Sequence, residues 1–268
     1  MLRGIGALAV LLLLAWCALY LYTEQAMQGT DVPLSGGLPN GDVASGERLA
    51  RIHGCTSCHG GQLQGAVFAE IPHIARLIAP NLTVVRDRYD QQAFVRLMRA
   101  GTKVDGRLAL LMPNKAHQRL TDQQLADLEA FLRSVPAVAN ELPSRRIQTL
   151  ARIGVVTGAY DVDEMRADPP ESAAVLADRN QPDRTRHFVQ TACSECHGLD
   201  LQGHPEEGVP PLSIARAYND QQFLRLLHEG KTLAGTDSAT GMMSGVERAR
   251  FSLLTPEEVA AIKDVLGR

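Results

Sequence analysis

A five-residue pattern, two cysteines three positions apart followed at once by a histidine, occurs twice in the chain. One turn of backbone then presents two thiols that can bond the two vinyl-derived arms of a haem, while the histidine reaches the iron. This spacing is typical of c-type haem attachment. The six residues are Cys55, Cys58 and His59 in the first copy and Cys193, Cys196 and His197 in the second. Four of the five cysteines therefore serve one pattern.

Cysteine pairs at this spacing have other uses, and each requires a particular structural context in the rest of the chain. A thioredoxin-like redox pair belongs in a βαβ unit, but no alternating β-branched runs flank either copy. A zinc ion held by four cysteines needs the two pairs to converge, although they lie far apart and each carries its own histidine. Two disulfides are the third alternative. The histidine in both copies favours haem over these three.

The length and composition suit two domains. A chain of 268 residues allows about two, each with its own core. Aromatic residues make up only 4% of the chain, and a large apolar macrocycle in each core would supply the missing bulk. The net charge of −3 offers no excess of positive charge for nucleic acid, so no nucleic-acid partner is predicted.

The N-terminal residues 1–22 are predicted to be a transmembrane anchor. From Gly4 to Tyr22 the chain carries no charge, and as a helix this stretch spans roughly 28 Å, close to the hydrocarbon thickness of a bilayer. Arg3 precedes it, and no Lys or Arg follows until Arg48. The N-terminus is therefore predicted to stay in the cytoplasm, with the remainder of the chain outside the inner membrane, in the periplasm.

A cleaved signal peptide is the alternative to an anchor. Its apolar region would be shorter, about 7–15 residues, and an A-x-A-like site would follow. Neither feature fits well here, which favours the uncleaved anchor. Cys17 follows the bulky Trp16, so it is interpreted as a small apolar residue of the helix rather than a lipidation site.

The first unit is predicted to span residues 42–138, after a linker over 23–41 that Pro33, Gly36 and other Gly and Pro residues keep irregular. Asp42 can cap a helix that leads into the first pattern. A glycine-marked loop is expected from Gly60 to Pro80. Two further helices follow, and their signals are Asp90 at the start and Gly101 at the end of one, and Thr121 with Gln124 as the capping box of the other.

The second unit, residues 178–268, repeats these signals. Leu63-Gln64-Gly65 returns as Leu201-Gln202-Gly203 at the same distance from the first cysteine. Residues 89–101 return as 218–230, and Thr255 with Glu258 forms the last capping box. Between the units, residues 139–177 are expected to be a connector with a helix over 144–156 that wraps one or both domains. The chain is thus predicted to be all-α, an internal duplication after one transmembrane helix.

With both units in view, the chain resembles class I c-type cytochromes, specifically membrane-anchored dihaem cytochromes c. The resemblance covers residues 42–138 and 178–268. It implies two tandem all-α cytochrome c-like domains, each wrapped around one covalently bound haem c. It also implies a proximal histidine and a distal methionine on each iron, and electron transfer as the activity. Haem attachment in this family takes place outside the cytoplasm, which agrees with the predicted orientation.

The resemblance also implies the remaining site residues. Met112, followed by Pro113 in the loop before the last helix, is the expected distal ligand of the first iron, and nearby His117 is its competitor. In the second unit Met243 is favoured over its neighbour Met242. The expected iron ligands are therefore His59, Met112, His197 and Met243.

A proline carbonyl is expected to accept the other N–H of each proximal histidine. The resemblance assigns this part to Pro80 in the first unit and to Pro210 in the second. An ordinary loop proline is the alternative at both positions.

The function implied is electron carriage. The partners expected are a membrane dehydrogenase as donor and a terminal oxidase or a soluble electron carrier as acceptor, with no reaction catalysed by the chain alone. The alternative is a dihaem redox enzyme, such as a peroxidase or a thiosulfate dehydrogenase. A peroxidase needs an iron with an open position, and the methionine candidates in both units count against it. A membrane-tethered scaffold without redox activity is a third possibility.

Overall fold

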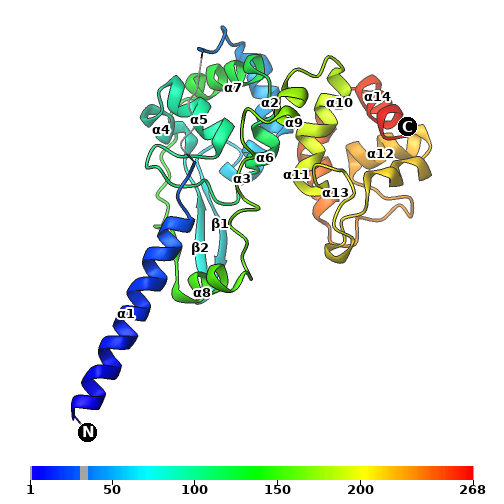
Figure 1. Ribbon diagram of the computed structural model, residues 1–268. Helices are drawn as coiled ribbons and strands as arrows, with labels where there is room; N and C mark the ends of the chain where they lie inside the picture. Colours follow the sequence, from blue (N-terminus) through cyan, green and yellow to red (C-terminus); the bar gives the residue numbers. More distant parts are fainter. Residues whose placement is uncertain (1, 31–35, 268) are drawn as a thin grey trace.

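The computed structural model describes residues 2–30 and 36–267. Two helical domains lie side by side, and one long helix projects from the first of them (Figure 1). The predicted all-α fold with two tandem units after an N-terminal helix is confirmed, and 56% of the residues are helical. The three strands that the described residues contain are short and belong to one small sheet.

Helix α1, Leu2–Ala26, projects away from the rest of the protein (Figure 1). Its stretch Gly4–Ala26 is long and apolar enough to cross a membrane, and the side chains there are largely exposed. The helix runs four residues beyond the predicted end at Tyr22. The chain then stays attached to the first domain, since the Gly29 N–H donates to Gly106 O (2.8 Å) and the Leu108 N–H donates to Met27 O (2.9 Å).

The structure therefore differs from the predicted linker over 23–41 at its start. Residues 23–26 continue α1, and residues 27–30 pair with the first domain. Apolar contact drives this attachment, because Met27 is buried against Leu108 and Val162. Pro33, which the sequence indicated as a chain breaker, lies outside the described residues.

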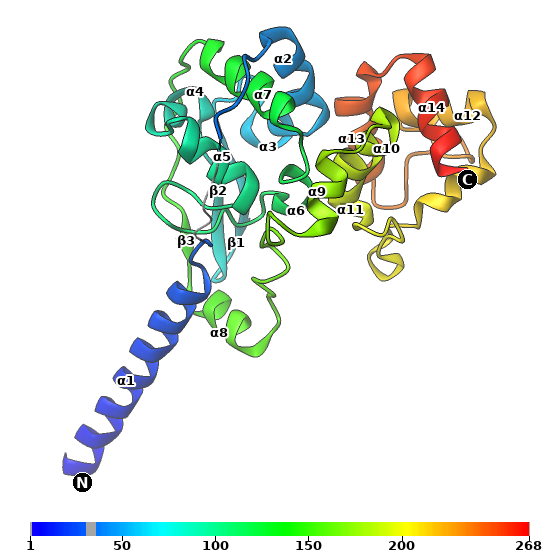
Figure 2. The ribbon, with the colours of Figure 1, turned by 45° about the horizontal axis from the view of Figure 1, so that its top comes forward.

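The first domain is built on a pair of helices, α2 (Val43–Ile52) and α7 (Asp122–Ser134), which pack along one another (Figure 2). Their predicted caps are present: Asp42 accepts from the Ser45 N–H, and Thr121 with Gln124 forms a capping box. Gly46 allows the close approach, because a Cβ there would collide with the Asp127 backbone of α7. The other helical segments are α3 (Cys55–His59), α4 (Leu82–Val85), η1 (Arg86–Arg88), α5 (Gln91–Ala100) and α6 (Asn114–His117).

The loop expected between Gly60 and Pro80 contains a β-hairpin instead. Strand β1, Ala66–Ile71, pairs antiparallel with β2, Ala75–Ala79, and β3, Arg146–Ile147, adds to the outer edge of β2. The apolar and β-branched run in these strands suits extended backbone. The third strand comes from a distant part of the chain, so no local signal indicated its pairing with β2.

The connector packs against the first domain. It contains β3, helix α8 (Thr149–Thr157) and helix α9 (Ala173–Arg179). The helix predicted from Ser144 begins five residues later, because residues 146–147 pair with β2. Arg152 of α8 holds α1, since its guanidinium lies 3.8 Å from the centroid of the Tyr20 ring and 2.6 Å from a Glu24 carboxylate oxygen.

The second domain repeats the helical plan without the hairpin. Its elements are α10 (Arg184–Phe188), the π-helical η2 (Val189–Cys193), α11 (Ser194–His197), η3 (Pro205–Glu207), η4 (Leu212–Ala217), α12 (Asp220–Glu229), α13 (Met242–Arg250), η5 (Phe251–Leu253) and α14 (Pro256–Leu266). Thr255 and Glu258 form the predicted capping box of α14. The apolar core of this domain includes Ile52, which belongs to α2 of the first domain. The two domains therefore share a packed boundary.

One hydrogen-bonding contact, from a side chain to a backbone carbonyl, recurs in both domains at the same position of the repeat. In the first, the buried Arg99 guanidinium donates to the carbonyls of Gln118 and Leu120 and pairs with Asp122 at 2.6 Å. In the second, the His228 ring donates to Leu254 O at 2.9 Å. Leu120 and Leu254 each directly precede the capping threonine of the last helix. Both contacts hold the entry of that helix against the preceding one.

Replacing Arg99 by leucine is expected to destabilise the first domain by about 3–5 kcal/mol, because two buried carbonyls lose their donor. The free energy of unfolding, from urea titration followed by circular dichroism, measures the effect. Arg51→Ala is the control, since Arg51 is half exposed and its one ion pair among the described residues is with Glu47 on its own helix. A loss equal to that of the control would contradict the proposed role of Arg99.

Candidate haem-binding sites

The first cysteine–histidine pattern forms the short helix α3, directly after α2. Gly54 separates the two helices with φ of 74°, a left-handed conformation that favours glycine. The turn sets Cys55, Cys58 and His59 on one helical turn, all of them half-buried. Gly60, with φ of 83°, ends the turn. The backbone thus presents the three side chains together, as the spacing predicts.

The ring of His59 is oriented by a backbone carbonyl. Its Nδ1 donates to Pro80 O at 2.8 Å, which leaves Nε2 as the ring nitrogen available to a metal. Burial lowers the pKa of His59, and the bond to Pro80 opposes that change. The ring is therefore held neutral at physiological pH, the form in which an imidazole binds iron.

The second pattern has the same geometry. It spans the end of η2 and helix α11, and His197 Nδ1 donates to Pro210 O at 2.8 Å. The loops after the two patterns also match, because the Leu82 N–H donates to Leu63 O as the Leu212 N–H donates to Leu201 O. Leu63 and Leu201 even share a positive φ, 59° and 60°, which is rare for leucine. The repeated Leu-Gln-Gly sequence thus encodes one strained loop used twice.

Met112 lies between α5 and α6, half-buried against the apolar core of the first domain. Cys55 packs against the same core. Asn114 positions this loop, since its side-chain amide donates to Ala109 O (3.0 Å) and to Met165 O of the connector (2.7 Å). His117 lies elsewhere: its ring centroid is 6.4 Å from that of His53, in an edge-on arrangement.

In the second domain the two neighbouring methionines differ in exposure. Met242 is 63% exposed, whereas Met243 packs against the second-domain core together with Cys193. Both stand at the start of α13, whose N-terminus is tied to the end of α12. The buried Ser244 hydroxyl donates to Gly230 O at 2.6 Å, and a Cβ at Gly230 would collide with the Ser244 backbone. This close contact turns Met243 toward the core.

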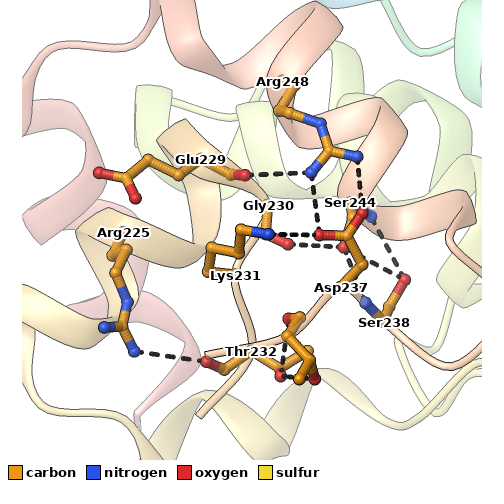
Figure 3. Close-up of polar contacts among 10 residues, drawn as sticks. Arg225, Glu229, Gly230, Lys231, Thr232, Asp237, Ser238, Ser244 and Arg248 are labelled. Atoms are coloured by element: carbon orange, nitrogen blue, oxygen red, sulfur yellow. Dashed lines mark hydrogen bonds and ion pairs between the residues drawn. The ribbon is translucent and has the colours of Figure 1, made fainter. Parts of the chain in front are cut away.

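A polar network holds the loop that precedes Met243 in the chain (Figure 3). Asp237 accepts from Lys231 at 2.8 Å and from Arg248 at 3.0 Å, while the Ser238 N–H donates to the Ser244 hydroxyl at 2.8 Å. The bonds to Arg248 and Lys231 lower the pKa of Asp237 to about 2, so its carboxylate is ionised at neutral pH. The network fixes the loop at both ends, residues 230–232 and 244–248.

The chemistry of these residues fits a covalently attached haem. All four motif cysteines are free thiols, and burial raises the pKa of Cys55 and of Cys193 to about 12. Among residues 2–30 and 36–267, no three His, Cys, Asp or Glu side chains converge as a metal site, which a shared four-cysteine zinc ion requires. Each domain instead offers two thiols, an oriented imidazole and a thioether around one apolar core.

The comparison with protein families decides the identity of the fold. The family model of cytochrome c matches residues 43–136 and again residues 185–264, together more than half of the chain. The chain belongs to the cytochrome c family. Each cytochrome c domain contains one of the cysteine pairs, so the protein holds two covalent haem c groups. A search of the curated proteins finds no match to this chain.

Several residues that shape the cytochrome c domains carry no signal in the sequence. Asn114 and Ser244 support the two methionine loops from tertiary contacts, and neither stands in a motif. Arg250 lies between the two attachment patterns, 2.6 Å from Glu195 and 3.4 Å from the Ser57 hydroxyl. The alignment of the two repeats could have indicated the methionine loops. Arg250 has no such signal, because its partner Ser57 is 193 positions away.

Glu247 of α13 is fully buried, and neither carboxylate oxygen has a hydrogen-bond partner among the described residues. Burial raises the pKa of Glu247 from 4.5 to about 8, against the opposing charge of Arg248. The carboxyl is therefore protonated in the folded protein at neutral pH. Its folded pKa lies above the unfolded value, so its stabilising contribution is complete below about pH 4.5 and is lost as pH rises through about 8.

Glu247→Gln is expected to remove this pH dependence, because glutamine has the same shape and no charge. Above pH 8 the variant should exceed the wild type in free energy of unfolding by on the order of 4 kcal/mol, and near pH 4.5 the two should agree. Urea unfolding at pH 4.5, 7 and 9 measures the difference. Parallel pH profiles for the two proteins would show that Glu247 does not titrate in this range.

Proposed function

We propose that the protein is a membrane-anchored dihaem electron carrier, with both haem domains on the periplasmic side of the inner membrane. The observation that carries the proposal is the repeated core arrangement: in each domain a cysteine of the attachment pattern and one methionine pack against the same apolar core. When bound, the haem iron takes up and releases single electrons. The residues of the chain hold each haem, orient its ligand and exclude water.

Met112 and Met243 are the proposed distal ligands, opposite His59 and His197. The core position of each methionine supports the assignment, and the 63% exposure of Met242 argues for its neighbour. A thioether ligand raises the reduction potential of a haem relative to a second imidazole. With a histidine and a methionine both available to each iron, the haems would exchange electrons without binding a substrate, which suits a carrier better than a peroxidase.

The anchor proposal rests on α1 and its contacts. Its apolar side chains are exposed, as a lipid environment requires, and Trp16 and Tyr20 lie near the end that joins the first domain. Arg152 attaches α8 to this end of α1 through the Thr23 hydroxyl (2.6 Å) and Glu24. Arg3 before the apolar run and the absence of other basic residues up to Arg48 support an outward orientation of the domains.

Substitution of the two methionines tests the ligand proposal. In Met112→Ala and in Met243→Ala, one haem should lose its sulfur ligand, so the methionine–iron charge-transfer band of the oxidised protein should fall by about half and one midpoint potential should drop. Met242→Ala and His117→Ala are the controls and should keep the wild-type spectrum. A spectrum that changes in His117→Ala but not in Met112→Ala would assign the first iron to His117.

The proposed direction of electron flow runs from a membrane dehydrogenase to a terminal oxidase or a soluble carrier. In native membranes, addition of a dehydrogenase substrate should reduce both haems of the protein, and admission of oxygen should reoxidise them. Absorption spectra of the reduced haems follow both steps, and membranes that lack this protein are the control. Turnover of hydrogen peroxide by the purified protein would instead support the alternative of a dihaem redox enzyme.

A further inference from the structure

The two haem-attachment patterns face one another across the domain boundary. Helix α6 of the first domain lies against η2 and α11 of the second, while α13 and η5 lie against α2 (Figures 1 and 2). Ile52, two residues before Gly54, is part of the second-domain core. His53 is 4% exposed, and burial lowers its pKa to about 3, so the boundary beside the first pattern is both dry and uncharged at that residue.

One ion pair occupies the space between the two patterns. Arg250, 6% exposed, extends from the end of α13 and pairs with Glu195 inside the second pattern at 2.6 Å. Its Nε also donates to the Ser57 hydroxyl inside the first pattern at 3.4 Å. The guanidinium packs so closely on Gly54 that any Cβ there would collide with it. Arg250 is thus in contact with both patterns.

The second cysteine of each pattern lies beside the ion pair of Arg250 and Glu195. Cys58 directly follows Ser57, whose hydroxyl accepts from Arg250, and Cys196 directly follows Glu195, which pairs with Arg250. Since these sulfurs are the points of covalent attachment, the cysteine-linked sides of both haems lie beside one ion pair.

We propose that Arg250 is the positioning residue that holds the two attachment patterns at the separation across which the two haems would exchange electrons. The inference rests on the proposed carrier function. In the step, one electron passes from the ferrous iron of one domain to the ferric iron of the other. The first iron is oxidised and the second reduced, and no bond or proton moves.

Opposite charge changes at this ion pair provide the test. Arg250→Ala leaves the Glu195 carboxylate unpaired between the two haems, and this negative charge should stabilise ferric iron and lower both midpoint potentials. Glu195→Gln keeps the shape and leaves Arg250 unpaired, so both potentials should rise. A role confined to packing does not produce shifts of opposite sign. Potentiometric titration of the full-length holoprotein in detergent measures both haems.

A second ion pair between the domains supplies matched controls. Arg48 and Glu258 also lie 2.6 Å apart across the boundary, but their side chains are 44% and 42% exposed, and their hydrogen bonds join Leu253 and Thr255 rather than either pattern. Arg48→Ala and Glu258→Gln should leave both potentials at the wild-type values, because solvent screens an exposed pair. These controls distinguish the effect of losing any ion pair between the domains from the effect of losing the pair of Arg250 and Glu195.

Kinetics provide the second readout. After photoreduction of a fraction of the haems, electrons equilibrate between the two irons. Arg250→Ala should slow this equilibration severalfold, because the rate of electron tunnelling falls exponentially as the two haems move apart. Arg48→Ala should equilibrate at the wild-type rate. Should Arg250→Ala fail to fold, the isosteric Glu195→Gln variant carries both readouts.

Failure of this inference can be told from failure of the proposed function. Intact mass must show two haems in the wild type, and both must reduce reversibly; otherwise the carrier proposal itself is wrong. If those conditions hold and the Arg250 and Glu195 variants match the Arg48 and Glu258 controls in potential and in rate, the proposal for Arg250 is overturned. Shifts confined to one haem would also overturn it, because the pair contacts both patterns.

Discussion

The hydrogen bond from a histidine Nδ1 to a proline carbonyl is the contact on which each domain depends. It joins His59 to Pro80 and His197 to Pro210, at 2.8 Å in both cases. The bond fixes the plane of the ring, its tautomer and the nitrogen left free for iron. Much of each domain serves to bring these two groups together: the glycine turns, the strained leucines at 63 and 201, and the helix that supports each pattern.

The two domains keep these contacts while differing around them. Arg99 and His228 hold the start of the last helix in the first and second domain, respectively. Asn114 and Ser244 hold the two methionine loops. The first also contains a hairpin between Gly65 and Pro80, and the third strand of its sheet comes from the connector. Helix α8 of the connector lies against α1. The anchor helix is thus attached through the first domain and the connector.

Local signals in the sequence predicted much of this fold. The attachment patterns, the caps at Asp42, Thr121 and Thr255, and the helix end at Gly101 each depend on hydrogen bonds between residues a few positions apart. The hairpin was missed because the Gly and Pro residues of 60–80 indicated a loop, and its third strand was missed because β3 pairs with a strand about 70 residues earlier. The attachment of residues 27–30 to residues 106–108 was missed for the same reason. Contacts of this kind follow from tertiary packing, and no short pattern encodes them.

Ile52 illustrates what a shared core means for such a molecule. It ends a helix of one domain and fills space inside the other, at 2% exposure. The second domain, synthesised alone, would contain an empty volume the size of a branched aliphatic side chain. The core of the second domain is therefore incomplete without the first. Folding of the second domain in turn covers Ile52, so the two interiors are closed by the same contact.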